Sequence, residues 1–165
     1  DDYDYNFIYR PHENLYIDNL IVKGRQRFGH KAIRRDDIRA MLTCLKNSGS
    51  MINLLDQDMG PNSSDFVPFF GVQTATLSSI LYKIAKQADA QIIPAMFYRE
   101  ADGEYVLKYY EPLVFDNNLT EEKKAIELAK TYNQILESTV REYPDQYLWA
   151  HRRFKTRPKG EDSFY

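Results

Sequence analysis

The sequence predicts a single α/β domain, spanning residues 1–165, with a mainly parallel sheet flanked by helices. Strand-like and helix-like segments alternate through the first hundred residues, which is typical of parallel sheets. Hydrophobic residues make up 43% of the 165 residues, a composition and length that suit one domain with one core. An Asp-Gly pair between two aromatic runs predicts a hairpin after the alternating part.

The first half of the chain predicts two strands and two helices. A strand over Tyr5–Tyr9 ends at Arg10-Pro11. A helix begins near Leu15, because apolar positions then recur with a helical period. These positions are Ile17, Leu20, Ile21, Gly24 and Phe28. A second helix opens at Asp36 or Asp37 and ends at residues 47–49, and the "SMINLL" run at 50–55 predicts a buried strand.

The second half predicts a third helix, a hairpin and a long helix. "FVPFFG" at residues 66–71 reads as an aromatic loop, and Thr74 or Thr76 as the N-cap of the third helix. Strands over 91–99 and 105–112 are joined at Asp102-Gly103, a pair that favours a type I′ turn. Thr120, followed by two glutamates, starts a long helix that reaches about Glu142.

Charge is unevenly distributed along the chain, although the net charge is only −2. Residues 23–39 hold seven Lys/Arg against two Asp, and residues 151–165 hold five Lys/Arg against one Glu and one Asp. Two basic segments on an acidic body suggest an anionic partner. Two solvated charged faces would explain the same pattern.

Several kinds of site are excluded by what the chain lacks. A single cysteine, Cys44, rules out an internal disulfide and is best read as packing. No apolar run approaches the ~20 residues that a membrane-spanning helix needs. The three histidines show neither a triad pattern nor zinc-ligand spacing, so we expect no metal and find no general base.

The stretch "LLDQDMGP" places two carboxylates, Asp56 and Asp58, where a predicted strand ends. Ligands in open α/β sheets gather beyond the carboxyl ends of strands. Gly60 and Pro61 predict a tight turn, which leaves two interpretations: a structural Asx-type turn, or a site linked to arginine or an anion. A calcium loop is excluded because the twelfth position is Val67 instead of glutamate.

Arginines near this stretch are candidates for the same site. Arg10 follows the end of a predicted strand, as Asp56 does, so both side chains can lie at the same edge of the predicted sheet. Arg25 lies at the border of the apolar face of the helix that begins near Leu15, where its guanidinium group can reach a pocket. An exposed helix arginine is the plainer alternative. The tail "WAHRRFKTRP" mixes aromatic and basic residues, which suits nucleic acid, phosphate headgroups or a membrane surface.

Four stretches together resemble one known family. They are "YRPHEN", "GRQRFG", "DQDMGPNSSDFVPFFGVQTAT" and "PDQYLWAHRRFKTRPKGEDSFY". They are similar to the lipid A biosynthesis acyltransferases, the lauroyl and myristoyl transferases of Gram-negative bacteria in the lysophospholipid acyltransferase superfamily. The resemblance implies a glycerolipid-acyltransferase-like fold at the cytoplasmic face of the inner membrane. It also implies transfer of a fatty acyl chain from acyl carrier protein to a hydroxyl of a lipid A precursor.

The resemblance assigns roles residue by residue. Asp56 and Arg25 match functionally important positions and are expected to be catalytic, while four further residues are expected to bind substrate: Arg10, Asp58, Arg152 and Arg153. The family's His-x4-Asp/Glu base is absent here. We therefore expect this chain to be the C-terminal part of the enzyme, truncated at its N-terminus and inactive alone.

Partners and alternatives follow from the same reading. The expected partners are acyl carrier protein, a lipid A precursor and the inner-membrane surface. Acyl carrier protein carries the acyl group that serves as co-substrate. We expect no other cofactor and no nucleic-acid partner. A related glycerolipid acyltransferase, and a non-catalytic anion- or RNA-binding module, remain alternatives. In the tail we expect four residues to be substantially buried: Tyr147, Leu148, Trp149 and Phe154. We also expect some of its arginines to pair with carboxylates of the acidic body.

Overall fold

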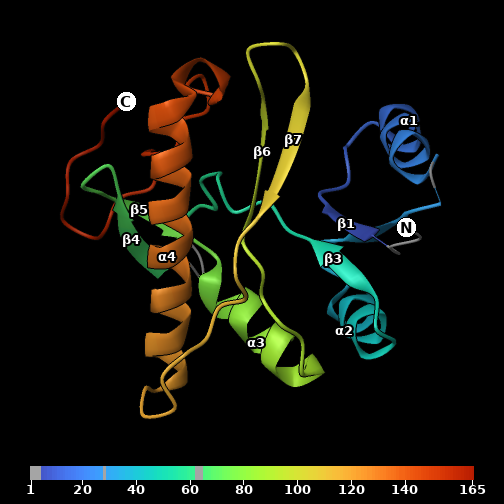
Figure 1. The fold of residues 1–165 in the computed structure, drawn as a ribbon, viewed down its shortest axis with the longest axis horizontal. Coiled ribbons are helices and arrows are strands. Elements are labelled where there is room, and N and C mark those ends of the chain that lie inside the picture. The colour runs from blue at the N-terminus through green and yellow to red at the C-terminus, as the bar shows by residue number, and fades with distance from the viewer. Residues whose placement is uncertain (1–4, 28, 62–64) are drawn as a thin grey trace. The chain divides into compact units, whose positions relative to one another are not determined.

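The computed structural model describes residues 5–27, 29–61 and 65–165, which form two compact units (Figure 1). The first unit contains Asp1–Leu54 and Ile84–Ala90, and the second contains Leu55–Lys83 and Gln91–Tyr165. Helix α3, Ser78–Ala88, contributes to both. The α/β class is confirmed, whereas the assignment of 1–165 to a single domain stays a prediction.

The first unit holds a three-stranded parallel sheet in the order β2-β1-β3. Its strands are β1 (Tyr5–Tyr9), β2 (Lys31–Arg34) and β3 (Ser50–Ile52). Helices α1 (Leu15–Gln26) and α2 (Ile38–Lys46) connect them, and the Asp37 side chain caps α2 as expected. Three buried side chains form the core: Ile33, Met41 and Ile84. The predicted parallel sheet is therefore present, but it has only three strands.

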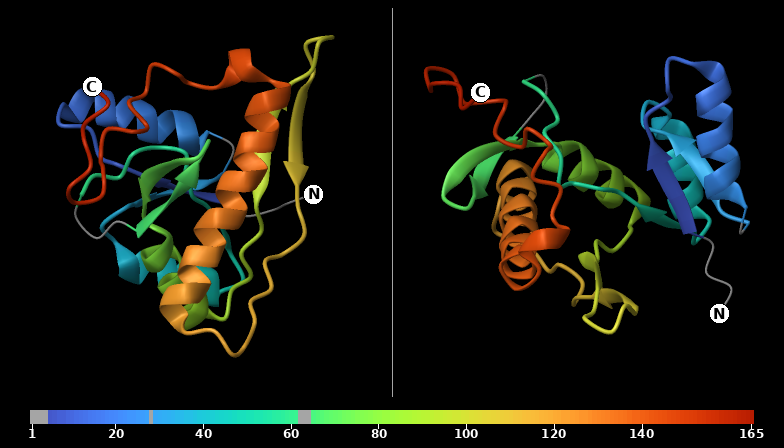
Figure 2. Two further views of the ribbon diagram at one scale, coloured as in Figure 1. Left: turned by 90° about the vertical axis from the view of Figure 1, so that its left-hand side faces the viewer. Right: turned by 90° about the horizontal axis from the view of Figure 1, so that it is seen from above.

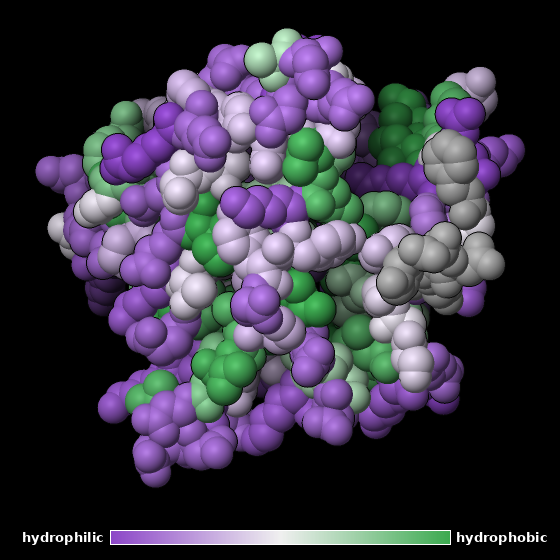
Figure 3. Space-filling view, in the orientation of Figure 1, coloured by the Kyte–Doolittle hydropathy of each residue, from purple (hydrophilic) through white to green (hydrophobic). Residues whose placement is uncertain are grey.

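Helix α1 begins where the hydrophobic period predicts, yet none of its described residues is buried. Leu15, Tyr16 and Leu20 are its most exposed apolar side chains. The face of the molecule drawn in Figure 3 accordingly shows separate hydrophobic patches between hydrophilic atoms. Among the described residues, α1 presents its apolar stripe outward.

The second unit contains two antiparallel hairpins, so a mainly parallel sheet is wrong for this part of the chain. The first hairpin pairs β4 (Asp65–Phe69) with β5 (Val72–Thr76), and the second pairs β6 (Ala95–Arg99) with β7 (Tyr105–Tyr109). In the first hairpin Phe70 and Gly71 both have positive φ, at 49° and 78°. That is the conformation of a type I′ turn, which reverses the chain in two residues. The predicted aromatic loop is therefore a hairpin.

Turn and cap positions differ from the sequence prediction at two further places. The β6–β7 connection uses five residues, 100–104, with positive φ at Gly103 but not at Asp102, so the predicted type I′ turn is wrong. Thr74 and Thr76 lie in β5 and do not cap α3. Instead, the Asp65 carboxylate accepts hydrogen bonds at the start of α3 from the Ser79 backbone N–H and from both serine hydroxyls.

Helix α4, Glu121–Glu142, matches the prediction, including the Thr120 cap. It runs alongside the β4–β5 hairpin (Figure 1) and is tied to that hairpin by polar contacts. The buried Asn133 side chain donates to the Pro68 carbonyl at 2.8 Å, and Glu137 accepts from the Phe70 N–H at 2.7 Å. No described helix is long and apolar enough to cross a membrane. The short 3-10 helix η1, Pro144–Gln146, follows α4 and leads into the C-terminal segment.

Candidate active site

The two carboxylates of interest lie on the 55–61 loop, which follows β3 and has no helix or strand of its own. Leu55 anchors the loop, because it is 5% exposed and packs in a core cluster with Tyr82 and Leu128. Gly60 has φ 81° and donates its N–H to Asp58 Oδ1 at 2.9 Å. The Asx-type turn that the sequence left open is therefore present, and Asp58 makes it.

The C-terminal segment, residues 147–157, runs beside the 55–61 loop and the β4–β5 hairpin (Figure 2). Thr156 donates twice to Asp58: its backbone N–H to Oδ2 and its hydroxyl to Oδ1, both at 2.9 Å. His151 Nε2 accepts the Asp58 N–H at 2.9 Å, which requires that nitrogen to be unprotonated. Asp58 is thus engaged by the chain itself, and its expected role in substrate binding stays a prediction.

Arg153 is also turned inward, and its expected role in substrate binding stays a prediction. It is 1% exposed, and its Nη1 donates to the carbonyls of Gln57 and Ala75, the second at 3.2 Å. Its Nε and Nη2 atoms are buried without a hydrogen-bond partner among the described residues. Burial lowers the pKa of the guanidinium, and nearby Tyr147 and Asp56 act in the opposite direction.

Asp56 differs from Asp58 in its side-chain environment. Its carbonyl oxygen accepts from the Tyr147 hydroxyl at 3.4 Å. No hydrogen bond or ion pair to its carboxylate is present within residues 5–27, 29–61 and 65–165. Burial raises the pKa values of the Tyr132 and Tyr147 phenols, and the charge of Asp56 adds to both shifts. The carboxylate therefore lies near two tyrosines and Arg153, and no described residue bonds to it.

Arg10 and Arg25 belong to the first unit, and both side chains are exposed. Arg10 directly follows β1, and Arg25 lies in the last turn of α1. Because β1 and β3 are parallel, Arg10 lies at the same edge of the sheet as the end of β3. The pairing of either arginine with Asp56 stays a prediction.

The prediction for the aromatic residues of the tail is partly wrong. Leu148 and Trp149 are 62% and 55% exposed. The indole N–H of Trp149 donates to the Pro144 carbonyl at 2.6 Å, which holds the ring at the surface. Tyr147 and Phe154 do pack against the core, around Phe69.

The remaining tail cations have mixed environments. Arg152 is exposed, with its guanidinium 5.6 Å from the Tyr165 ring centre. Arg157 donates to the Gln73 carbonyl and pairs with Glu161 of the same tail. The expected pairing of tail arginines with carboxylates of the acidic body is therefore replaced by bonds to backbone carbonyls and to Glu161.

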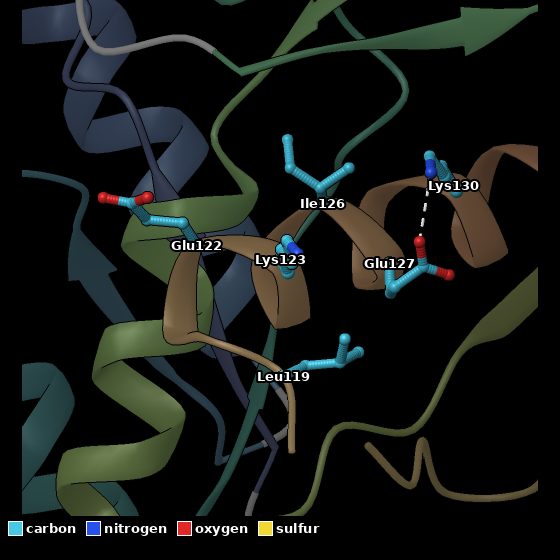
Figure 4. A pocket seen from close by; sticks show the side chains of 6 residues that line it. All are labelled: Leu119, Glu122, Lys123, Ile126, Glu127 and Lys130. Carbon is cyan, nitrogen blue, oxygen red and sulfur yellow. Dashed lines mark hydrogen bonds and ion pairs between the residues drawn. The ribbon is translucent and has the colours of Figure 1, made fainter. Parts of the chain in front are cut away.

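A surface hollow on α4 is a poor candidate for the active site. Figure 4 shows side chains of α4 together with that of Leu119, which precedes the helix, and Glu127 and Lys130 point toward each other at 3.0 Å. The lining residues are Leu119, Glu122, Lys123, Ile126, Glu127 and Lys130. Alternating charges at this spacing are typical of a solvated helix face. Among the described residues, no cluster of His, Cys, Asp and Glu could hold a metal ion.

Three residues of the Asp56 environment were not assigned a site role from the sequence: Tyr132, His151 and Thr156. Tyr132 lies on α4, and its burial at a helical period resembles that of any core residue. His151 directly precedes Arg152, and Thr156 stands between Lys155 and Arg157. Their position beside basic residues is the only signal in the sequence, and it does not identify a partner that lies 93 residues away for His151 and 98 for Thr156.

The chain is thus an α/β protein in which the 55–61 loop, after β3, carries the Asp56 carboxylate in a fixed position. The family model described as bacterial lipid A biosynthesis acyltransferase matches residues 4–156. The chain belongs to the bacterial lipid A biosynthesis acyltransferases.

Individual relatives agree with the family match. The chain is 34% identical over 157 residues to the lipid A biosynthesis palmitoleoyltransferase of Escherichia coli K12, covering 95% of this chain and 50% of the relative. It is 33% identical over 159 residues to the lauroyltransferase of the same organism, covering 96% and 51%. For the myristoyltransferase the identity is 31% over 148 residues, covering 88% and 43%. The chain thus spans about half the length of these relatives.

Proposed function

We propose that this protein takes part in transferring a fatty acyl chain from acyl carrier protein to a hydroxyl of a lipid A precursor, at the cytoplasmic face of the bacterial inner membrane. Family membership supports acyl transfer as the reaction class, and the names of the relatives support a role in lipid A biosynthesis. The donor, the membrane face and the absence of any further cofactor are part of the proposal.

The chemistry is the exchange of a thioester for an ester. The acceptor hydroxyl oxygen attacks the thioester carbonyl carbon, the new C–O bond forms, and the C–S bond to the carrier breaks. The hydroxyl proton passes to a base, and the carrier thiolate ends as the thiol. We infer that the base is none of the three histidines of this chain, since none has Asp or Glu five residues later. The 165-residue chain alone is accordingly expected to show no turnover.

The observation that carries the proposal is the carboxylate of Asp56, which makes no hydrogen bond or ion pair with the described residues and lies on a loop that is otherwise fixed. Asp58, one residue beyond Gln57, accepts three hydrogen bonds from the chain, whereas Asp56 presents its carboxylate. A carboxylate placed this way can hold a reacting group in the geometry of attack, which is worth several orders of magnitude in rate. Arg25 is the second residue that we propose to be catalytic.

The exposed arginines Arg10 and Arg152 are the proposed contacts for anionic groups. Guanidinium groups bind phosphate in a bidentate way, and lipid A precursors, acyl carrier protein and the inner-membrane surface all supply anions in this proposal. Both side chains are available for such contacts because neither is buried.

The experiment supplies the complete protein, as its gene encodes it, with acyl carrier protein loaded with a fatty acid. One reaction offers a lipid A precursor as acceptor and a parallel one offers lysophosphatidate. Mass spectrometry should detect one added acyl chain on the lipid A precursor only. Acylation of lysophosphatidate alone would favour the related glycerolipid acyltransferase, and no acylation of either lipid would overturn the proposed activity.

A further inference from the structure

We propose that Thr156 and Arg153, on the C-terminal segment, are positioning residues that hold Asp56 in the geometry required for acyl transfer. The inference rests on the proposed function, because it concerns the same carboxylate. It adds two residues that act through Gln57 and Asp58, the two residues directly after Asp56.

The 55–61 loop depends on side chains from elsewhere for its shape. It contains neither helix nor strand, so no regular backbone ladder fixes it. Leu55, directly before Asp56, is held by the core cluster. Directly after Asp56, the Gln57 carbonyl accepts from Arg153, and the Asp58 carboxylate accepts from Thr156. Asp56 is therefore held on one side by packing and on the other by the C-terminal segment.

The C-terminal segment is itself well fixed, so it can serve as a support. Phe154 stacks on Phe69, with ring centres 6.2 Å apart, and Arg153 reaches the Ala75 carbonyl of β5. The Tyr147 hydroxyl meets the Asp56 carbonyl. These contacts join residues 78 to 98 positions apart within the second unit. A rigid supporting layer of this kind is what precise placement of a reacting group needs.

Arg153 is poorly explained as a packing residue alone. A buried guanidinium with two nitrogen atoms that find no acceptor among the described residues is costly, and an apolar residue of similar size generally gives equal or greater stability. Its positive charge lies near Asp56 and Asp58, and it interacts with both. A cation beside the loop opposes the repulsion between the two carboxylates, which stand two residues apart. This gives the guanidinium a role in the site that an apolar residue could not fill.

The first test uses Thr156→Val and Thr156→Ser in the complete protein, with Thr139→Val as the matched control. Thr139 also makes one hydroxyl bond, to the Ile135 carbonyl, but lies on α4 outside the 55–61 loop and its contacts. Thr156→Val should lower kcat by about tenfold or more with KM within about twofold, because misplacement of a reacting group acts on the chemical step. Thr156→Ser should restore kcat to within about twofold of wild type. Equal kcat for Thr156→Val and Thr139→Val, or no rescue by serine, would overturn the inference.

The second test uses Arg153→Lys and Arg153→Met, so that the inference does not depend on one variant folding well. Lysine keeps the charge and methionine removes it, at similar side-chain length. We expect Arg153→Lys to keep at least about tenfold more kcat than Arg153→Met when both are assayed below their unfolding temperatures. Equal kcat for these two variants would remove the electrostatic part of the inference.

Asp56→Asn separates this inference from the proposed function. Wild-type activity in Asp56→Asn would show that the proposed site itself is wrong. Loss of activity in Asp56→Asn, together with normal kcat in both Thr156→Val and Arg153→Met, would leave the site standing and reject only the positioning role.

Discussion

Thr156 binds both carboxylate oxygens of Asp58, through its backbone N–H and its hydroxyl, at 2.9 Å each, although 98 residues separate the two in the sequence. These two hydrogen bonds join the C-terminal segment to the 55–61 loop. Stability of the loop therefore depends on a residue near the end of the chain.

The first prediction concerns the stability that Asp58 provides. Asp58→Ala leaves the Thr156 hydroxyl and two backbone N–H groups without their acceptor, which should cost about 1–3 kcal/mol of unfolding free energy. Urea unfolding followed by circular dichroism measures the loss. Asp102→Ala is the control, because the Asp102 carboxylate accepts a local bond from the Glu104 N–H in an exposed hairpin. An equal, small loss in both variants would show that the contacts with Thr156 contribute nothing.

The second prediction concerns the link between α4 and β4. Asn133→Leu keeps the side-chain volume but leaves the Pro68 carbonyl without its donor, so we expect a loss of about 1–3 kcal/mol. Gln134→Leu, one residue along the same helix but exposed, should change the unfolding free energy by less than about 0.5 kcal/mol. Thermal unfolding of both variants tests this. A stabilised Asn133→Leu variant would mean that apolar packing outweighs the bond.

The third prediction is a loss of stability at alkaline pH. Burial raises the pKa of the Tyr132 phenol, so the folded state keeps a proton that the unfolded state releases above about pH 10. The stability from this group is complete below pH 10 and falls as pH rises further. Burial also raises the pKa of Tyr143, to about 12, so part of the slope will remain without Tyr132.

The measurement compares unfolding temperatures between pH 9 and pH 11.5. Tyr132→Phe should flatten the decline above pH 10, and Tyr105→Phe, on the exposed side of the hairpin, should follow the wild type. Identical curves for wild type and Tyr132→Phe would show that this phenol ionises equally in both states.

Local signals in the sequence predicted the elements that local chemistry determines. Thr120 with its following glutamates marked α4, Asp37 marked α2, and the period after Leu15 marked α1. The Phe70-Gly71 turn was missed because a phenylalanine at positive φ is unfavourable by itself. It is supported from α4, where Glu137 accepts the Phe70 N–H and Arg141 lies 4.9 Å from the ring centre.

The candidate site shows the same division between local and distant chemistry. A carboxylate pair followed by Gly60 predicted a turn at the end of the strand, and the turn is present. Thr156 and Arg153 bond to Asp58 and Gln57 and not, among the described residues, to the Asp56 carboxylate, and these partners are set by the path of the whole chain. Composition likewise indicated that the tail packs back, but it did not show that Arg153 would be buried and Trp149 exposed.

The fourth prediction concerns Arg25. Arg25→Ala in the complete protein should lower kcat/KM by about 10²-fold if its guanidinium stabilises charge in the transition state. Lys23→Ala is the matched control, since Lys23 is another exposed cation near the end of α1. Similar kcat/KM in both variants would reduce Arg25 to a surface arginine, which the sequence left open as an alternative.

The most direct measurement of the central claim is kcat/KM of the complete protein for acyl transfer to a lipid A precursor, in wild type, Asp56→Asn and Asp162→Asn. Asp56→Asn keeps the shape of the side chain and removes its charge, and Asp162 is an exposed carboxylate of the tail. We predict a loss of about 10²-fold or more for Asp56→Asn. The melting temperature should stay near that of wild type and Asp162→Asn should have full activity. Wild-type kcat/KM in Asp56→Asn would contradict the account.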